Sequence, residues 1–217
     1  MRIVDVNSEE FNRYGVVIKT SEISVAGREN LVAYLTTDTE APVSGNVYVA
    51  DDGAIHQMAV ADEIKSVLAY DEVQFGYCHG NSSKVNALEW HECQELVLAA
   101  TECALYLGHP EALVTVEGHL NFDSKNLIAV QLKQGEIIRL EPRIMHFAPT
   151  KVTEDPYRTL IVLEKGTNTP LEHQGEGHLF MENKWLITHS DRQDLVEKGA
   201  WPGLVGLNYD WQDLKDL

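Results

Sequence analysis

Cysteine is scarce in this chain, which has three in 217 residues: Cys78, Cys93 and Cys103. The number is odd and no two of them form a CxxC pair, which argues against both a disulfide framework and a thiolate zinc knuckle. We therefore expect a protein of a reducing compartment, the cytoplasm.

Basic residues are also few, with 17 lysines and arginines against 34 acidic residues and a formal net charge of −17. Such a surface repels polyanions, because no excess of positive charge is available to neutralise phosphates. We expect neither nucleic acid nor an anionic membrane surface as a partner.

Long hydrophobic runs are absent. The most apolar stretch, residues 96–108, is too short to span a bilayer and contains Glu102. The opening Met1-Arg2-Ile3-Val4-Asp5 leads directly into polar residues instead of an apolar segment. We expect no secretion and no membrane insertion.

The first 72 residues mix helical and strand patterns, which predicts an α/β extension packed on the rest of the chain. Ser8 before Glu9 and Glu10 is typical of a helix start, and Gly15 of its end. Further helices are predicted over residues 27–35 and 61–70, and strands over 16–18 and 46–50.

Between residues 73 and 165 the pattern changes to short β-branched or alternating runs separated by turn residues. This pattern is typical of an antiparallel sandwich or barrel, and eight such runs predict a jelly roll. The predicted strands cover residues 73–78, 87–92, 96–106, 113–117, 127–132, 135–140, 145–152 and 159–163.

Residues 166–217 form a tail of different character that contains Trp185, Trp201 and Trp211. Ser190 and Gln193 have the spacing of a capping box, which predicts a helix through Lys198. Tryptophans in such a tail usually pack against the main domain or a neighbouring subunit. The predicted fold is therefore mainly β, with a helical tail.

Potential metal ligands occur at even spacing at Glu89, His91 and Glu95, and His146 follows about fifty residues later. In an extended chain the three side chains would project from one face, which can be the inside of a barrel. Carboxylates combined with imidazoles suit Mn²⁺, Fe²⁺, Zn²⁺, Ni²⁺ or Co²⁺. Burying two carboxylates without a cation would cost several kcal/mol, which favours a divalent metal or a basic substrate.

The same residues resemble the cupin superfamily, an antiparallel jelly-roll β-barrel. Its first motif runs His, any residue, His, three or four residues, then Glu, with a Gly further on; Glu89, His91, Glu95 and Gly108 stand at these positions, Gly108 later than usual. Gly135, Pro142 and His146 correspond to the second motif. The chain departs from the pattern in having Glu89 for the first His, and Ile144 and Thr150 near the internal Gly and final Asn.

Two further resemblances lie within the cupins. Gly76-Tyr77-Cys78-His79-Gly80-Asn81-Ser82-Ser83, Ala87-Leu88-Glu89-Trp90-His91 and Gly166-Thr167-Asn168 resemble a bacterial family catalogued as a domain of unknown function. Residues 135–163 are similar to ureidoglycolate lyase, in which the second motif also leads into a His and an apolar strand.

These resemblances imply a metal-dependent enzyme that acts on a small sugar, sugar acid or related hydroxy-carbonyl metabolite. Isomerisation or epimerisation is the leading expectation, a ureidoglycolate lyase-like reaction is the second, and a non-catalytic metabolite-binding barrel is the third. Cupin resemblance also implies a homodimer.

Five further residues are candidates for roles in the site, and two of them, Tyr77 and His79, stand just before a turn and could reach a barrel mouth. His79, beside a turn, and Glu141 are candidates for moving a proton. Arg143, Tyr77 and Lys133 are candidates for binding the substrate, with Arg143 nearest His146 in sequence.

Overall fold

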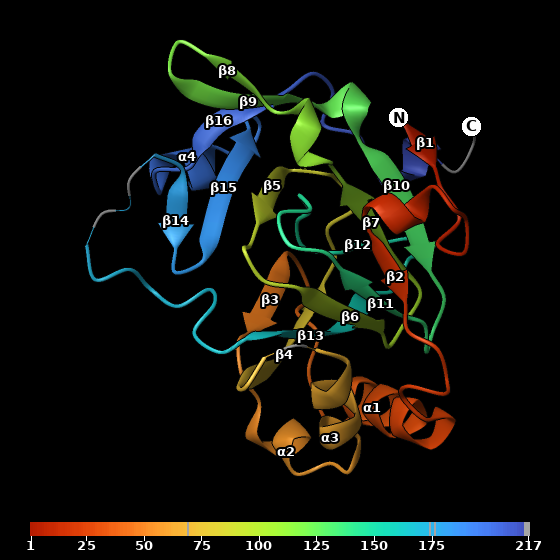
Figure 1. The fold of residues 1–217 in the computed structure, drawn as a ribbon. Helices are drawn as coiled ribbons and strands as arrows, with labels where there is room; N and C mark the ends of the chain where they lie inside the picture. The colour runs from red at the N-terminus through yellow and green to blue at the C-terminus, as the bar shows by residue number, and fades with distance from the viewer. Residues whose placement is uncertain (69, 174, 176, 215–217) are drawn as a thin grey trace.

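The computed structural model describes residues 1–68, 70–173, 175 and 177–214, and over these ranges the chain is mainly β, as predicted. Within the same ranges, none of the helices has both the length and the apolar character that a membrane span requires. The strands form three sheets, and three helices lie together on one side (Figure 1).

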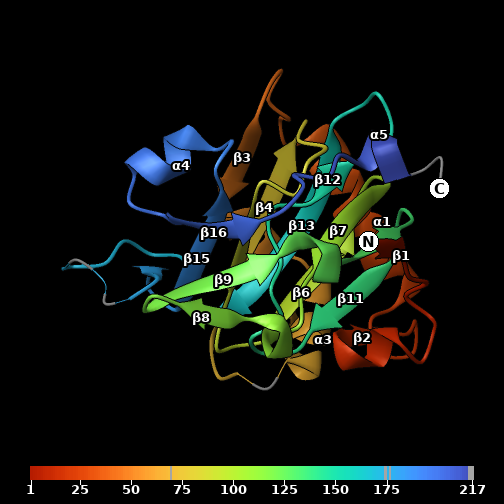
Figure 2. The same cartoon turned by 90° about the horizontal axis from the view of Figure 1, so that it is seen from above.

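The first sheet has the strand order β2-β11-β6-β13-β4-β3 and is antiparallel throughout (Figure 2). Along its strands the side chains alternate between two cores: Phe75, Leu96 and Leu98 face the helices, whereas Cys78 and Val97 face the barrel interior. The strands are β2 (Gly15–Val17), β3 (Asn46–Val49), β4 (Val73–Gly80), β6 (Glu95–Ala99), β11 (Ile137–Leu140) and β13 (Tyr157–Glu164).

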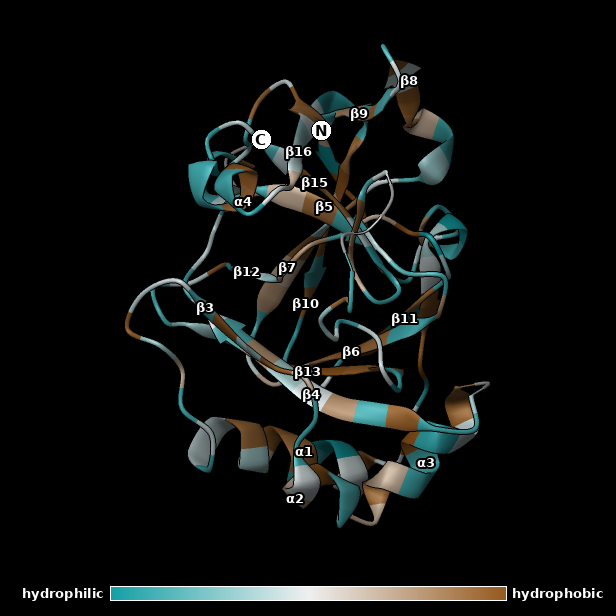
Figure 3. Ribbon diagram, turned by 90° about the vertical axis from the view of Figure 1, so that its left-hand side faces the viewer, coloured by the Kyte–Doolittle hydropathy of each residue, from teal (hydrophilic) through white to brown (hydrophobic). Residues whose placement is uncertain are grey.

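Helices α1 (Val25–Thr37), α2 (Gly53–His56) and α3 (Val60–Val67) cover the outer face of this sheet (Figure 3). Ser24 caps α1 by accepting a hydrogen bond from the backbone of Gly27. The expected helix after Ser8 is only a single 3₁₀ turn, η1 (Phe11–Arg13). The helices cover one face of the sheet, and Cys78 and Ile161 of the other face line a cavity.

The second sheet has the order β1-β10-β7-β12 and packs against the inner face of the first. Their shared core includes Val97 and Ile161 from the first sheet and Leu105 and Val130 from the second. The strands are β1 (Arg2–Ile3), β7 (Cys103–Leu107), β10 (Ile128–Leu132) and β12 (Thr150–Lys151).

The tail forms strands as well as helices and supplies half of the strands of the third sheet. Strand β15 pairs with β5, which places Leu186 opposite Glu89, and parallel with β16. The strands are β5 (Ala87–Trp90), β8 (Val114–Val116), β9 (His119–Asp123), β14 (Leu179–Met181), β15 (Lys184–His189) and β16 (Trp201–Val205). The helices are η2 (Pro110–Ala112), η3 (Ser124–Asn126), α4 (Gln193–Glu197) and α5 (Trp211–Leu214).

Two predicted strands differ from the structure. The expected strand 96–106 is divided into β6 and β7, because the chain turns at residues 100–102 to pass from the first sheet to the second. The expected strand 145–152 is regular only in β12, with single bridges at Met145 and His146. Strand pairing joins the three predicted segments, and their division into domains stays a prediction.

Candidate metal centre and cavity

Two backbone hydrogen bonds place Glu89 beside His146. The Glu89 N–H donates to the carbonyl of His146 at 2.6 Å, and the His146 N–H donates to the carbonyl of Glu89 at 2.9 Å. This isolated antiparallel bridge brings the two predicted motifs together across a sequence separation of 57 residues. Opposed residues in such a pair have neighbouring side chains.

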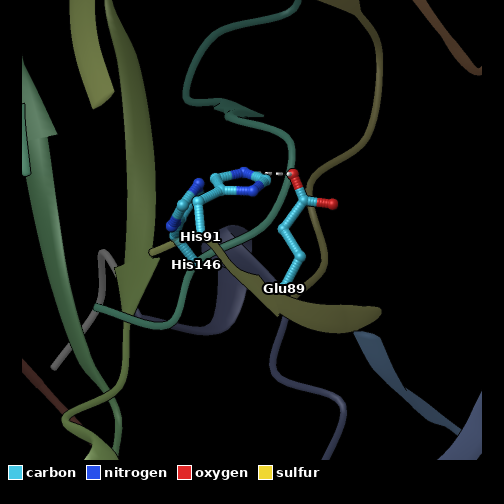
Figure 4. Close-up of side chains that lie close together, drawn as sticks. All are labelled: Glu89, His91 and His146. Carbon is cyan, nitrogen blue, oxygen red and sulfur yellow. Dashed lines mark ion pairs between the residues drawn. The ribbon is translucent and has the colours of Figure 1, made fainter. Parts of the chain in front are cut away.

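The four predicted ligands meet at this bridge. Ligand atoms of Glu89, His91 and His146 all lie within 4.8 Å of one another (Figure 4). Glu95 Oε2 lies 2.9 Å from His146 Nε2 and 3.5 Å from His91 Nε2. Glu95 comes from β6 rather than from the strand of Glu89, because the chain bends between Trp90 and Glu95.

Backbone carbonyls fix the orientation of both imidazoles. His91 Nδ1 lies 2.7 Å from the carbonyl oxygen of Asn183, and His146 Nδ1 lies 2.9 Å from that of Ile144. Carbonyls only accept, so each Nδ1 is the protonated nitrogen and, in the neutral ring, Nε2 carries the free lone pair. His91 Nε2 is buried and has no hydrogen-bond partner among the described residues. This arrangement is typical of metal-ligating histidine.

The centre is buried and strongly charged. Lys184 forms an ion pair with Glu89 Oε2, while Glu89 Oε1 faces His91 Nε2 at 3.9 Å. Burial would raise the pKa of Glu89, but the Lys184 ammonium and the two imidazoles hold it below its usual value. The two oxygens of Glu89 therefore have separate roles, one held by Lys184 and the other facing the imidazole cluster.

The pKa values of the two histidines are shifted in opposite directions. Burial would lower the pKa of His146, but the adjacent Glu95 carboxylate outweighs it and raises the pKa to about 9. For His91, burial dominates and lowers the pKa. Without a metal, an imidazolium at His146 is thus paired with Glu95.

The donor set fits a divalent transition metal. Ligand atoms at about 2.0–2.2 Å from one ion lie up to roughly 4.4 Å apart, so shifts of a few tenths of an ångström would bring these atoms within range. The unpaired Nε2 of His91 and the mixed nitrogen and oxygen donors suit such an ion. The buried Glu89, His91 and His146 group can therefore hold a metal.

The centre opens into a cavity of about 550 Å³ whose wall includes Glu89, Glu95 and His146. The rest of the wall comes from strands β3, β4 and β13, the loops after β4 and β13, the segment between His146 and β12, and the tail. Its other lining residues are Gly45, Asn46, Tyr48, Cys78, Asn81, Ser82, Asn86, Phe147, Ala148, Pro149, Ile161, Asn168, Met181, Lys184 and Arg192.

Two predicted site residues lie on the wrong face of β4. His79 belongs to the strand rather than to the turn after it, is fully buried, and contacts Thr39 Oγ1 through Nε2 at 2.7 Å. Tyr77 stacks on His79 and packs against the core beneath the helices. Both share the strand parity of Phe75, so their side chains point away from the cavity lined by Cys78.

Three other predicted residues also lie outside the cavity. Arg143 is exposed and forms an ion pair with Glu92 at 2.9 Å, and Lys133 is exposed on the turn before β11. Glu141 accepts a hydrogen bond from Gln94 at 3.2 Å. None of these five residues lines the cavity, so the expected placement of Tyr77 and His79 at a barrel mouth is wrong, and Arg143, Lys133 and Glu141 do not face the cavity as expected of substrate-binding or proton-moving residues.

The functional residues that sequence reasoning missed come mainly from outside the barrel motifs. Lys184 and Asn183, at the turn between β14 and β15, contact Glu89 and His91, and Arg192 lines the cavity. Tyr48 and Asn168 complete its wall. The Glu182-Asn183 pair is a recognisable turn signal, but nothing in the local sequence shows that this turn packs against His91.

The sequence matches the family described as a domain of unknown function (DUF4867) over residues 3–209, and the chain belongs to this family. No curated protein matches the sequence.

Solved structures show distant likeness. Vicilin from Solanum melongena is 11% identical, with a TM-score of 0.38 over 76% of this chain and 39% of that one. Oxalate decarboxylase from Bacillus subtilis is 11% identical, with a TM-score of 0.35 over 64% and 29% respectively. The chain spans less than half the length of these proteins, and the likeness carries no inference about activity.

Proposed function

We propose that this member of the family is a metal-dependent enzyme that isomerises or epimerises a small hydroxy-carbonyl compound. One observation carries the proposal: Glu89, His91, Glu95 and His146 converge from three separate segments at a cavity, where a buried imidazole nitrogen of His91 has no hydrogen-bond partner among the described residues. Polar side chains without a common role are normally exposed and scattered, whereas these four are buried together.

Glu89, His91 and His146 would hold the metal through Oε1 and the two Nε2 atoms. A bound divalent cation polarises a carbonyl and acidifies the neighbouring C–H or O–H bond. Glu95 Oε2 contacts both imidazoles, so Glu95 would be either a fourth ligand or the carboxylate that accepts a proton from the substrate carbon and returns one to the product. Lys184 forms an ion pair with Oε2 of Glu89, which leaves Oε1 facing His91.

The cavity is the right size for such a substrate. A volume of about 550 Å³ lies within the range of small-molecule sites, and the centre itself is only 2–9% exposed at Glu89, His91, Glu95 and His146. Limited access of water strengthens the electrostatic interactions at the reacting atoms.

The test is proton exchange with solvent. The protein, reconstituted with Mn²⁺, Zn²⁺, Fe²⁺, Co²⁺ or Ni²⁺, is incubated in D₂O with pools of aldoses, ketoses and uronates, and deuterium incorporation is followed by NMR. We expect incorporation next to the carbonyl carbon and its loss in Glu95→Gln. His173→Ala is the matched control, because His173 is exposed in the loop before β14.

Saturable binding of a sugar by the metal-loaded protein without deuterium incorporation would instead favour the non-catalytic binding barrel. Release of urea from ureidoglycolate above the spontaneous rate would favour the lyase. Either result would replace the isomerase proposal.

A further inference from the structure

We propose that the cavity selects a neutral polyhydroxylated compound, an aldose or ketose, and that Tyr48 and Asn168 are the residues that select it. This inference rests on the proposed function of the metal centre, which it sharpens from hydroxy-carbonyl compounds in general to uncharged sugars. Neither residue belongs to the centre itself.

Amides and hydroxyls dominate the polar part of the cavity wall away from the metal centre. They come from β3, from the loop after β4 and from the loop after β13. The residues are Asn46, Tyr48, Asn81, Ser82, Asn86 and Asn168. Each of these groups is uncharged and can pair with a hydroxyl, which both donates and accepts.

Tyr48 and Asn168 present a donor and an acceptor side by side. Asn168 Nδ2 donates to the Tyr48 hydroxyl at 3.3 Å, so the hydroxyl oxygen acts as the acceptor of this bond and keeps its own proton to donate. Asn168 Oδ1 is buried and has no hydrogen-bond partner among the described residues. A buried acceptor is normally paired, and a substrate hydroxyl would satisfy it.

The cationic side chains of the described wall already have anionic partners. Lys184 is paired with Glu89, and Arg192 donates to both oxygens of Asp194 at 2.7 Å. Apart from His146, they are the cations of the described cavity lining. The charge of each of these cations is therefore already balanced, so the wall offers less attraction to a substrate carboxylate or phosphate than two unpaired cations would, whereas a neutral sugar needs no counter-charge.

Apolar side chains complete the match. Phe147, Ile161 and Met181 line the same cavity as the amides, which gives a wall with both polar and apolar parts. A sugar has the same division, with hydroxyls around its edge and C–H groups on its faces. Small-molecule sites are usually built this way, with few polar groups that fix orientation.

The first test compares the binding of neutral sugars with the binding of the corresponding uronic acids. Isothermal titration of the Zn²⁺-loaded protein uses D-galactose, D-glucose, D-mannose and D-xylose, each against its uronic acid, together with glucose 6-phosphate. We expect at least one neutral sugar to bind at least tenfold more tightly than its acid. Preference for the acid or phosphate, or no binding of any neutral sugar, would overturn the proposal.

The second test removes the Tyr48 hydroxyl and the Asn168 amide in two separate variants. Tyr48→Phe deletes one hydroxyl, and Asn168→Gly removes the amide while keeping the left-handed backbone at φ 66°. Each should weaken sugar binding about tenfold with zinc content unchanged. Tyr209→Phe, outside the cavity lining, is the matched control.

Unchanged sugar binding in both variants would refute selection by this pair, and loss of zinc in both would assign it a structural role instead. These failures are separable from failure of the metal centre, because in that case the native protein itself would hold no zinc and catalyse no deuterium exchange.

Discussion

The barrel segment and the tail contribute different halves of the same site. Residues 73–165 supply every predicted ligand, whereas the tail supplies Lys184 against Glu89 and Asn183 against His91. The ligands are recognisable from type and spacing, but their supporting partners are not. The comparison shows that the tail is part of the centre, because β15 pairs directly with β5, the strand of Glu89.

The largest effect should come from the barrel half. His146→Ala removes a ligand and the partner of Glu95, so we expect metal affinity to fall at least about 100-fold, more than an outer-shell change would cost. Competition with a chromogenic chelator measures this. His173→Ala should retain full affinity, and equal affinity in His146→Ala would remove His146 from the ligand set.

In the tail, Lys184→Met should destabilise the metal-free protein by about 3 kcal/mol, because Glu89 is left buried without its cation. Metal should restore part of this loss, since it offers the same carboxylate a second cation. Urea denaturation of both forms measures the difference. Lys165→Met breaks an exposed pair with Glu72 and should cost less than about 1 kcal/mol. Equal losses in the two variants would contradict a role for Lys184 at the centre.

A substitution of His79 in the barrel half should change stability without changing metal binding. Burial lowers its pKa to about 4, so the unfolded chain takes up a proton below pH 6.5 that the folded chain excludes. The contribution of His79 to stability is complete above pH 6.5 and is lost as pH falls toward 4, by about 2 kcal/mol between pH 7.5 and 5.

His79→Gln should abolish this part of the acid sensitivity and leave metal affinity unchanged. Denaturation at pH 7.5 and pH 5 gives the comparison. A large loss of metal affinity would mean that the helix-covered face of β4 communicates with the centre.

The smallest effect concerns Asn183. Its side chain accepts from the Glu92 N–H at 2.9 Å and donates to Thr167 and Cys93, which fixes the turn whose carbonyl orients His91. Asn183→Gly keeps the left-handed backbone at φ 53° but removes these bonds, so we expect about tenfold weaker metal binding. Chelator competition without any change would limit the role of the tail to Lys184.

The sequence predicted the β class and the helices over α1 and α3 because hydrophobic periodicity is a local signal. It also predicted the four residues that converge at the candidate centre, since ligand type and strand parity are local, and their role as metal ligands stays a prediction. It failed at His79 because the strand continues two residues beyond Cys78, which moves a supposed turn residue into the interior. Lys184 and Asn183 were not predicted because pairing of β15 with β5 joins segments nearly a hundred residues apart.

The most direct test of the central claim is the elemental metal content of the protein purified without an affinity tag or chelator, with Glu95→Ala alongside. We predict close to one transition-metal ion per chain in the native protein, and a marked loss in the variant. Absence of metal from the native protein, even after reconstitution with each of the five candidate ions, would contradict the account and leave Glu89 and Glu95 as substrate-binding or acid and base residues.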